Sequence, residues 1–144
     1  MSSEDNKALV RRFYEEVVNQ KNTAAIDEFF APNIVDHTAS PGTPGGIEGP
    51  KLHLDMYLTA FPGLHLTVED MIAEGDKVVA RVTARGTHLG ELRSTPPTDK
   101  QMTVTAIDIY RIAGGKFVEY WGIGDDLGLL QQLGVIPATG QGTA

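Results

Sequence analysis

The sequence predicts an α+β domain in which helices from the first part of the chain pack on a curved sheet formed by the rest. Three observations predict it. Before residue 62, apolar residues recur every three to four positions, as in amphipathic helices. After residue 64 the period changes to two, as in antiparallel strands. The 144 residues suit one domain with one core. In such a domain the space between helices and curved sheet can be a cone-shaped pocket.

The first expected helix covers residues 5–19. One side of this helix is apolar and the opposite side carries arginines and glutamates, which is the pattern of a surface helix with one buried face. The apolar residues follow helical spacing and are Leu9, Val10, Phe13, Tyr14 and Val17.

A second short helix is predicted to begin at Thr23, a good N-cap residue, and to stop before Pro32. A loop rich in proline and glycine follows over residues 38–49. The third helix is expected over residues 50–61, with Pro50 in its first turn, where the missing N–H of proline does no harm.

Four strands are expected after the helices, joined by short turns at Gly75-Asp76 and Gly114-Gly115 and by a longer loop over residues 93–100. Their alternating segments cover residues 65–75, 77–91, 101–112 and 116–123. A last short helix follows over residues 125–134.

One domain over residues 1–137 and a flexible tail over residues 138–144 are therefore expected. The net charge of −7 argues against a nucleic-acid partner, because phosphate binding needs a basic patch. No apolar run reaches the ~20 residues that span a bilayer. The chain has no cysteine, which excludes disulfides and thiolate chemistry and fits a cytoplasmic protein.

Strand parity identifies Asp108 as the candidate acid–base residue. Side chains on a strand alternate between faces, and the residues that share a face with Asp108 are Met102, Val104, Ala106, Tyr110 and Ile112. A carboxylate in apolar surroundings is costly and has a raised pKa, which suits it to proton transfer near neutral pH. The alternative is a solvated Asp108, or one paired with Arg81 or Arg111.

By the same parity, Val118, Tyr120 and Gly122 share one side of the last strand. The opposite side then carries Phe117, Glu119, Trp121 and Ile123. One layer of helices leaves this apolar face uncovered, so we expect a homodimer or higher homo-oligomer. Asp125 and Asp126 precede a helix-like segment and are expected chiefly to start that helix.

The histidines show no spacing typical of a metal site, so no metal is expected. His37 and His88 are candidates for lining a pocket, with a packed, hydrogen-bonded histidine as the alternative. His53 and His65 are expected on the surface. Tyr57, Tyr110 and Tyr120 could donate hydrogen bonds to a carbonyl oxygen, or could simply pack.

The segments "AFPGL", "GTHLGE", "PPTDK" and "GGKFVEYW", followed by "GLLQQLG", occur in an order that resembles the SnoaL-like polyketide cyclases. The resemblance covers about residues 5–135. It implies the cone-shaped fold of the nuclear transport factor 2-like superfamily, and ring closure by aldol condensation without metal or cofactor. In the family an aspartate follows the Trp-like position, and a histidine lies in the preceding strand. This chain has Gly122 and Asp108 at those positions, so it departs from the pattern at both.

The function expected from the sequence is therefore cofactor-independent cyclisation or isomerisation of an apolar, carbonyl-bearing, polyketide-like substrate. Asp108 would move the proton, with His37 and His88 as its partners. The expected substrate-binding residues are Phe61, Tyr57, Tyr110, Tyr120 and Asp125. Two alternatives stay open: an epoxide-opening or hydroxylating relative, and a ligand-binding protein without catalysis.

Overall fold

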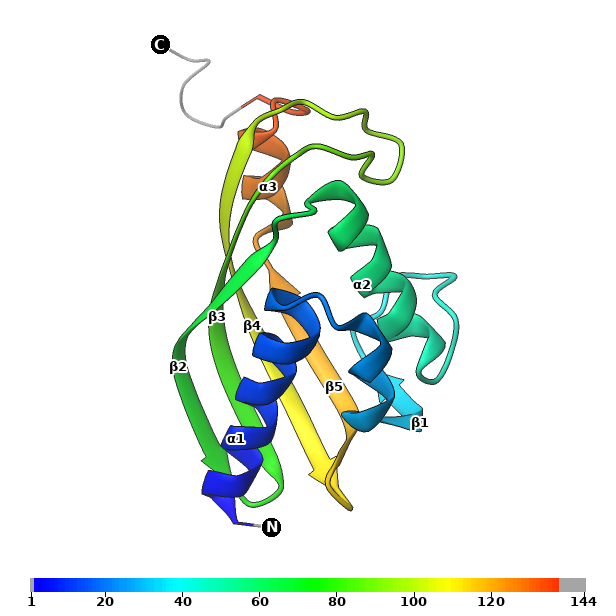
Figure 1. Cartoon of the computed structure of the whole chain (residues 1–144), viewed down its shortest axis with the longest axis vertical. Helices are drawn as coiled ribbons and strands as arrows, with labels where there is room; N and C mark the ends of the chain where they lie inside the picture. Colours follow the sequence, from blue (N-terminus) through cyan, green and yellow to red (C-terminus); the bar gives the residue numbers. More distant parts are fainter. Residues whose placement is uncertain (1, 138–144) are drawn as a thin grey trace.

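The computed structural model describes residues 2–137, in which helices cover one face of a five-stranded curled sheet (Figure 1). The strand order is β1-β5-β4-β3-β2, so the sheet has two free edges and does not close. The strands are β1 Phe30–Asp36, β2 His65–Glu74, β3 Lys77–Thr87, β4 Gln101–Ala113 and β5 Lys116–Gly124. β1 runs parallel to β5 and the other pairs are antiparallel, which confirms the expected α+β class with a mainly antiparallel sheet.

The first helix begins with a capping box, in which the side chains of Ser2 and Asp5 each accept a hydrogen bond from the backbone of the other residue. Helix α1, Ser3–Arg12, continues into a wider π-helical segment, Phe13–Asn19. A 3-10 helix, Thr23–Glu28, and the helices α2, Glu48–Ala60, and α3, Asp126–Gln132, complete the described elements. No helix within residues 2–137 is long and apolar enough to cross a membrane.

Strand β1 is the element that the sequence did not predict. The short helix before it ends at Glu28, and its N-cap is Asn22 instead of the predicted Thr23, without a side-chain hydrogen bond. Phe30, expected at the end of that helix, instead begins β1 and lies opposite Phe117 of β5. Parallel pairing of segments so distant in sequence leaves no hairpin signal, which explains the miss.

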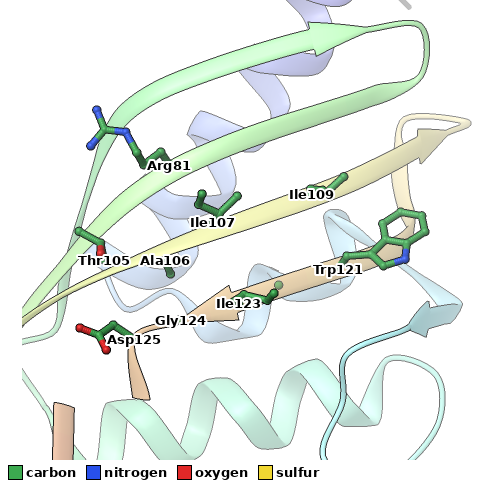
Figure 2. Close-up of a pocket in the computed structure, with 10 residues that line it drawn as sticks. Arg81, Thr105, Ala106, Ile107, Ile109, Trp121, Ile123, Gly124 and Asp125 are labelled. Atoms are coloured by element: carbon green, nitrogen blue, oxygen red, sulfur yellow. The ribbon is translucent and has the colours of Figure 1, made fainter. Parts of the chain in front are cut away.

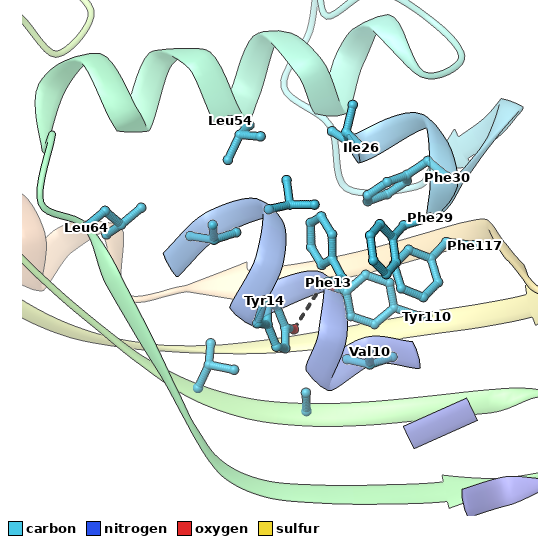
Figure 3. Packing of buried hydrophobic residues seen from close by; sticks show 14 of the residues in the cluster. Val10, Phe13, Tyr14, Ile26, Phe29, Phe30, Leu54, Leu64, Tyr110 and Phe117 are labelled. Carbon is cyan, nitrogen blue, oxygen red and sulfur yellow. Dashed lines mark hydrogen bonds between the residues drawn. The ribbon is translucent and has the colours of Figure 1, made fainter. Parts of the chain in front are cut away.

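An aromatic cluster fills the core between the helices and the sheet (Figure 3). Phe13 lies at its centre. Its ring centroid is 5.2 Å from that of Phe30, 5.6 Å from that of Phe117 and 6.3 Å from that of Tyr110. These tilted and edge-on contacts hold the end of the first helix against β4 and β5.

A β-bulge between β4 and β5 corrects one sequence prediction. The pairing shifts so that Phe117 lies opposite Ile112, whereas Tyr120 lies opposite Tyr110. The extra residue reverses the parity at the start of β5, so Phe117 is buried in the core and not on the outer face with Trp121. The apolar outer face is therefore smaller than predicted.

Candidate active site

Asp108 lies on the inner face of β4, and only 9% of its surface is exposed. Tyr14 Oη donates a 2.7 Å hydrogen bond to its Oδ2, and Tyr120 Oη donates a 2.5 Å hydrogen bond to its Oδ1. Neither of the arginines considered as partners reaches it. Arg81 binds Asp70 and Arg111 binds Glu119. The carboxyl group is therefore buried between two phenol hydroxyls, and it forms no ion pair with either of these arginines.

Burial raises the pKa of Asp108, because the charged form loses its hydration. The hydrogen bonds from Tyr120 and Tyr14 favour the charged form and oppose this effect without cancelling it. Asp108 can therefore exchange protons closer to neutral pH than an ordinary aspartate can, which is the property a general base needs.

A third phenol extends the network: Tyr110 Oη donates to Tyr14 Oη at 3.0 Å (Figure 3). Burial raises the pKa of Tyr14, Tyr110 and Tyr120, so all three stay protonated and act as donors. The sequence identified Tyr110 and Tyr120 but missed Tyr14. A signal was present, since a tyrosine on the buried stripe of an amphipathic helix needs a partner for its hydroxyl.

The side chain of Tyr120 fills the space next to Gly122. A β-carbon built at this position would lie 1.9 Å from Tyr120 Oη and 2.5 Å from its ring carbon Cζ. The Tyr120 phenol therefore lies over Gly122 on its way to Asp108. Any side chain at position 122, including the aspartate of the family pattern, would displace the phenol or be displaced by it.

His37 lies apart from Asp108, on the other face of the sheet. Its Nε2 is 2.6 Å from Glu119 Oε2, and its ring stacks on Trp121 with the centroids 4.6 Å apart. Glu119 also binds Arg111. Because side chains alternate along β5, Glu119 and Trp121 project away from the face that carries Tyr120. The structure does not bring His37 and Asp108 together.

His88 is fully buried beyond the end of β3, where its backbone N–H donates to the Lys100 carbonyl. Its Nδ1 accepts the Thr98 N–H at 3.2 Å, so the ring proton is on Nε2, which has no hydrogen-bond partner among residues 2–137. Its ring packs at 5.4 Å from the buried ring of Phe61. Lys100 precedes Asp108 by eight residues, a distance along a strand of roughly 25 Å. His88 and Phe61 therefore lie in a part of the core that is far from Asp108.

Asp125 is the N-cap of α3, and its Oδ1 accepts the Gly128 N–H at 2.9 Å. Asp126 is exposed in the first turn of the same helix. This geometry supports the prediction that the two acids chiefly start a helix.

Tyr57 is half-buried on α2, and its ring centroid is 4.7 Å from that of His53, one turn earlier. His53 was expected on the surface, and its ring is accessible to water. Nevertheless it lies near enough to Asp108 for its charge to lower the pKa of that carboxyl group. The structure confirms the prediction that His53 is exposed.

A shallow hollow of about 560 Å³ lies on the outer face of the sheet (Figure 2). Its walls include Arg81, Ile107, Ile109, Trp121, Ile123 and Asp125. A second hollow, of about 710 Å³, lies at the turns around Asp76 and Gly114. Neither of the two is lined by Asp108.

Comparison with known proteins identifies close structural relatives. A profile of SnoaL-like polyketide cyclases matches residues 8–133. TsrD from Streptomyces laurentii is 29% identical, with a TM-score of 0.86, over 94% of this chain and 99% of that one. AclR from Streptomyces galilaeus, described as a candidate hydroxylase, is 29% identical with a TM-score of 0.86, over 99% and 88% of the two chains. A candidate polyketide cyclase from Bacillus cereus is 33% identical with a TM-score of 0.80, over 94% and 87%. No curated protein gave a significant match.

Proposed function

The chain belongs to the SnoaL-like polyketide cyclase family, a cyclase-type enzyme family with the nuclear transport factor 2-like fold, and we propose that it cyclises or isomerises a carbonyl compound through an enolate. In this proposal the substrate is apolar and polyketide-like, and Asp108 is the base. No metal or cofactor takes part in the proposed steps.

The observation that carries the proposal is the buried carboxyl group of Asp108 between the phenols of Tyr14 and Tyr120. A buried carboxylate without a cation is destabilised in its charged form, so its affinity for a proton is high. Such a group is a functional-site candidate on physical grounds, because a merely structural aspartate would be stabilised by pairing.

The proposed first step transfers a proton from the carbon next to a carbonyl to an Asp108 oxygen. The electrons of the broken C–H bond move into the carbonyl, which becomes an enolate. In a cyclisation the enolate carbon then forms a bond to a second carbonyl carbon of the same molecule, and the resulting alkoxide takes up the proton. In an isomerisation the proton returns to another carbon of the enolate.

The protonated phenols have two roles in this scheme. They fix the Asp108 carboxyl group in one orientation, which keeps the base in reach of the C–H bond. Tyr120 is the phenol nearest to Gly122, the position of the family aspartate. We infer that its hydroxyl turns to the substrate oxygen as Asp108 loses its negative charge on protonation.

A second candidate function is water activation by Asp108, as in epoxide opening or hydroxylation. What favours it is the similarity to AclR, described as a candidate hydroxylase, which covers 99% of this chain. A ligand-binding protein without catalysis is the remaining alternative, and the experiment below distinguishes it.

The test is deuterium exchange at C2 of an aromatic β-keto ester in D2O, followed by proton NMR. This reaction needs the base and no ring closure. The wild-type protein should accelerate exchange, and Asp108→Asn should reduce the acceleration by about 100-fold or more. Asn keeps the size and one acceptor oxygen, so thermal melting should stay intact.

Asp125→Asn and Asp126→Asn are the matched controls, because they remove the same charge at the start of α3. Both should keep exchange activity, since asparagine also caps helices. Full activity in Asp108→Asn with loss in Asp125→Asn would move the base to the start of α3. No exchange by the wild type, with intact ligand binding, would favour the non-catalytic alternative.

A further inference from the structure

The two oxygens of the Asp108 carboxylate have unequal surroundings. Oδ2 accepts a hydrogen bond from Tyr14, which in turn accepts one from Tyr110, and both tyrosines are buried. Oδ1 accepts a hydrogen bond from Tyr120, which is partly accessible to water. One oxygen therefore faces a chain of two buried phenols, whereas the other faces a single phenol that water can reach.

The hydroxyl protons of the buried chain can be placed from these contacts. A charged carboxylate only accepts hydrogen bonds, so the one hydroxyl proton of Tyr14 lies in its 2.7 Å hydrogen bond to Oδ2. The hydroxyl proton of Tyr110 must then lie in the 3.0 Å hydrogen bond to Tyr14, because Tyr14 has no second proton to donate. Within residues 2–137 the Tyr110 hydroxyl makes no other hydrogen bond, so its proton has one acceptor, the oxygen of Tyr14.

This arrangement makes a proton on Oδ2 unfavourable. A protonated Oδ2 would have to donate to Tyr14, and the Tyr14 proton would have to turn toward Tyr110. The Tyr110 proton already points along that direction, and if it turned away as well, a buried O–H group would be left without an acceptor. Oδ1 has no such constraint, because the Tyr120 hydroxyl makes no further hydrogen bond in the described part of the chain and is free to turn away.

Aromatic packing keeps Tyr110 in this position. Its ring centroid lies 4.5 Å from that of Phe117 and 6.3 Å from that of Phe13, and both phenylalanines are buried. The ring of Tyr14 lies 6.2 Å away on the side of the hydrogen bond. A phenol enclosed in this way cannot swing to another acceptor, so its hydroxyl stays directed at Tyr14.

We propose that Asp108 takes up its proton on Oδ1, and that Tyr110 is the positioning residue that enforces this choice through Tyr14. The proposal rests on the proposed function where it concerns the substrate: the proton leaves the carbon next to the carbonyl, Oδ1 receives it, and the electron pair of the C–H bond stays with the enolate. The Tyr120 hydroxyl is then released from Oδ1 and donates to the enolate oxygen. The hydrogen bonds on the Oδ2 side stay in place throughout.

The experiment follows the Cζ carbons of the tyrosines by carbon-13 NMR while Asp108 is titrated. The chain has four tyrosines, so single phenylalanine variants assign every signal. As the pH falls through the raised pKa of Asp108, the Tyr120 signal of wild type should shift and the Tyr14 signal should stay. In Tyr110→Phe the Tyr14 signal should shift as well, because no proton then opposes the turning of the Tyr14 hydroxyl. Equal shifts of Tyr14 and Tyr120 in wild type would overturn the assignment of Oδ1.

Two control variants show what causes the shifts. Asp36 and His53 also act on the charge of Asp108, and Asp108→Asn leaves both of them in place, so the shifts should disappear in this variant. Phe117→Leu removes an aromatic contact of Tyr110 but no hydroxyl, so it should lower the melting temperature and leave the Tyr14 signal still. A Tyr14 signal that shifts in Phe117→Leu as it does in Tyr110→Phe would reduce Tyr110 to a packing residue.

Proton exchange of the β-keto ester separates this inference from the proposed function. Tyr110→Phe should slow exchange at neutral pH about fivefold, which corresponds to one neutral hydrogen bond. In a Tyr14→Phe background it should cause no further loss, because Tyr110 acts through Tyr14. Additive losses would overturn the role of Tyr110. If wild type gives no exchange but the tyrosine signals behave as described, the proposed function fails and the assignment of Oδ1 stands.

Discussion

Two carboxylates on neighbouring strands, Asp108 of β4 and Glu119 of β5, show how the two faces of one sheet treat the same chemical group. Glu119, on the outer face, binds Arg111 and lies 2.6 Å from His37. These hydrogen bonds, that of Arg111 first, lower its pKa. Asp108, on the inner face, accepts hydrogen bonds from two phenols and from no cationic side chain within residues 2–137, and burial raises its pKa. The charged form of Glu119 is thus stabilised, whereas Asp108 has a higher affinity for a proton than an ordinary aspartate.

The difference teaches that partner type distinguishes a structural carboxylate from a candidate base. An arginine stabilises the anion permanently and leaves it little affinity for a proton. Two phenols orient a carboxyl group without supplying a full opposite charge, so they cannot offset its burial. On the inner face, Gly122 has no side chain, and the Tyr120 phenol occupies the space that a side chain there would fill.

The largest expected effect concerns that glycine. Gly122→Ala should destabilise the protein by about 3 kcal/mol, because the new methyl group overlaps the Tyr120 phenol and breaks its hydrogen bond to Asp108. Urea unfolding measures the loss, and the β-keto ester assay should show reduced proton exchange.

Gly124→Ala on the same strand is the control. Its β-carbon would meet Ala106 Cβ at 3.7 Å, an ordinary contact, so the cost should stay below about 1 kcal/mol. In a Tyr120→Ala background the cost of Gly122→Ala should fall to a similar level. An equal cost in both backgrounds would show that the Tyr120 phenol is not what excludes a side chain at position 122.

The second effect tests the outer face, which we propose is covered by a second copy of the chain. Trp121, Ile107 and Ile109 line the outer hollow together with Ile123, which is 76% exposed (Figure 2). Ile123→Lys should weaken self-association about 30-fold, which corresponds to about 2 kcal/mol. Sedimentation at micromolar concentration should give twice the chain mass of 15.5 kDa for wild type and a single-chain species for the variant.

Leu52→Lys on α2 is the control for that experiment, because Leu52 is also exposed but belongs to the helical layer. It should leave the mass unchanged. A wild-type protein that sediments only as a single chain would contradict the dimer and would leave the apolar outer face without an explanation.

Much of this two-faced arrangement could be predicted from the sequence, because alternation along a strand is a local property. Parity placed Asp108 and Tyr120 on one face and Glu119 and Trp121 on the other, as the structure has them. Parity failed at Phe117, where a bulge adds one residue to β5. A bulge is selected by pairing with β4 and leaves no regular signal in its own strand.

Contacts between distant segments account for the other misses. Tyr14 and Asp108 are 94 residues apart, and only the docking of the first helix on the sheet brings them together. Strand β1 exists through its parallel pairing with β5. None of these features has a local period from which it could be predicted.

A smaller effect on stability, and a shift in the pKa of Asp108, are expected when one phenol hydroxyl is removed at a time. Tyr120→Phe should raise the pKa of Asp108 further, because the hydrogen bond from Tyr120 is the largest of the influences that lower it. Tyr14→Phe should raise it less, and each change should cost about 1 kcal/mol of stability. Carbon-13 NMR of the labelled carboxyl group measures the pKa, with Tyr57→Phe as the control outside the hydrogen-bond network. An unchanged Asp108 pKa in both variants would remove the phenols from the site.

The smallest effect is the dependence of stability on pH, and it has opposite signs for the two carboxylates. The pKa of Asp108 is raised in the folded protein, so its charged form costs stability above that pKa. Asp108→Asn should therefore be more stable than wild type at pH 7, by about 1 kcal/mol. As the pH falls through the raised pKa toward the ordinary aspartate value of about 3.9, wild type takes up the proton and the advantage should disappear.

Glu119 should behave in the reverse way. Its pKa is lowered in the folded protein, so the ion pair contributes stability above the ordinary glutamate value of about 4.3, and the contribution is lost as the pH falls through the lowered pKa. Glu119→Gln should thus be less stable than wild type at pH 7, and its deficit should shrink on acidification. Urea unfolding of the three proteins between pH 7 and pH 3 measures both differences, which should approach zero from opposite sides. If both variants are destabilised at pH 7 and recover together in acid, Asp108 is stabilised as an anion like Glu119, and the case for Asp108 as the base fails.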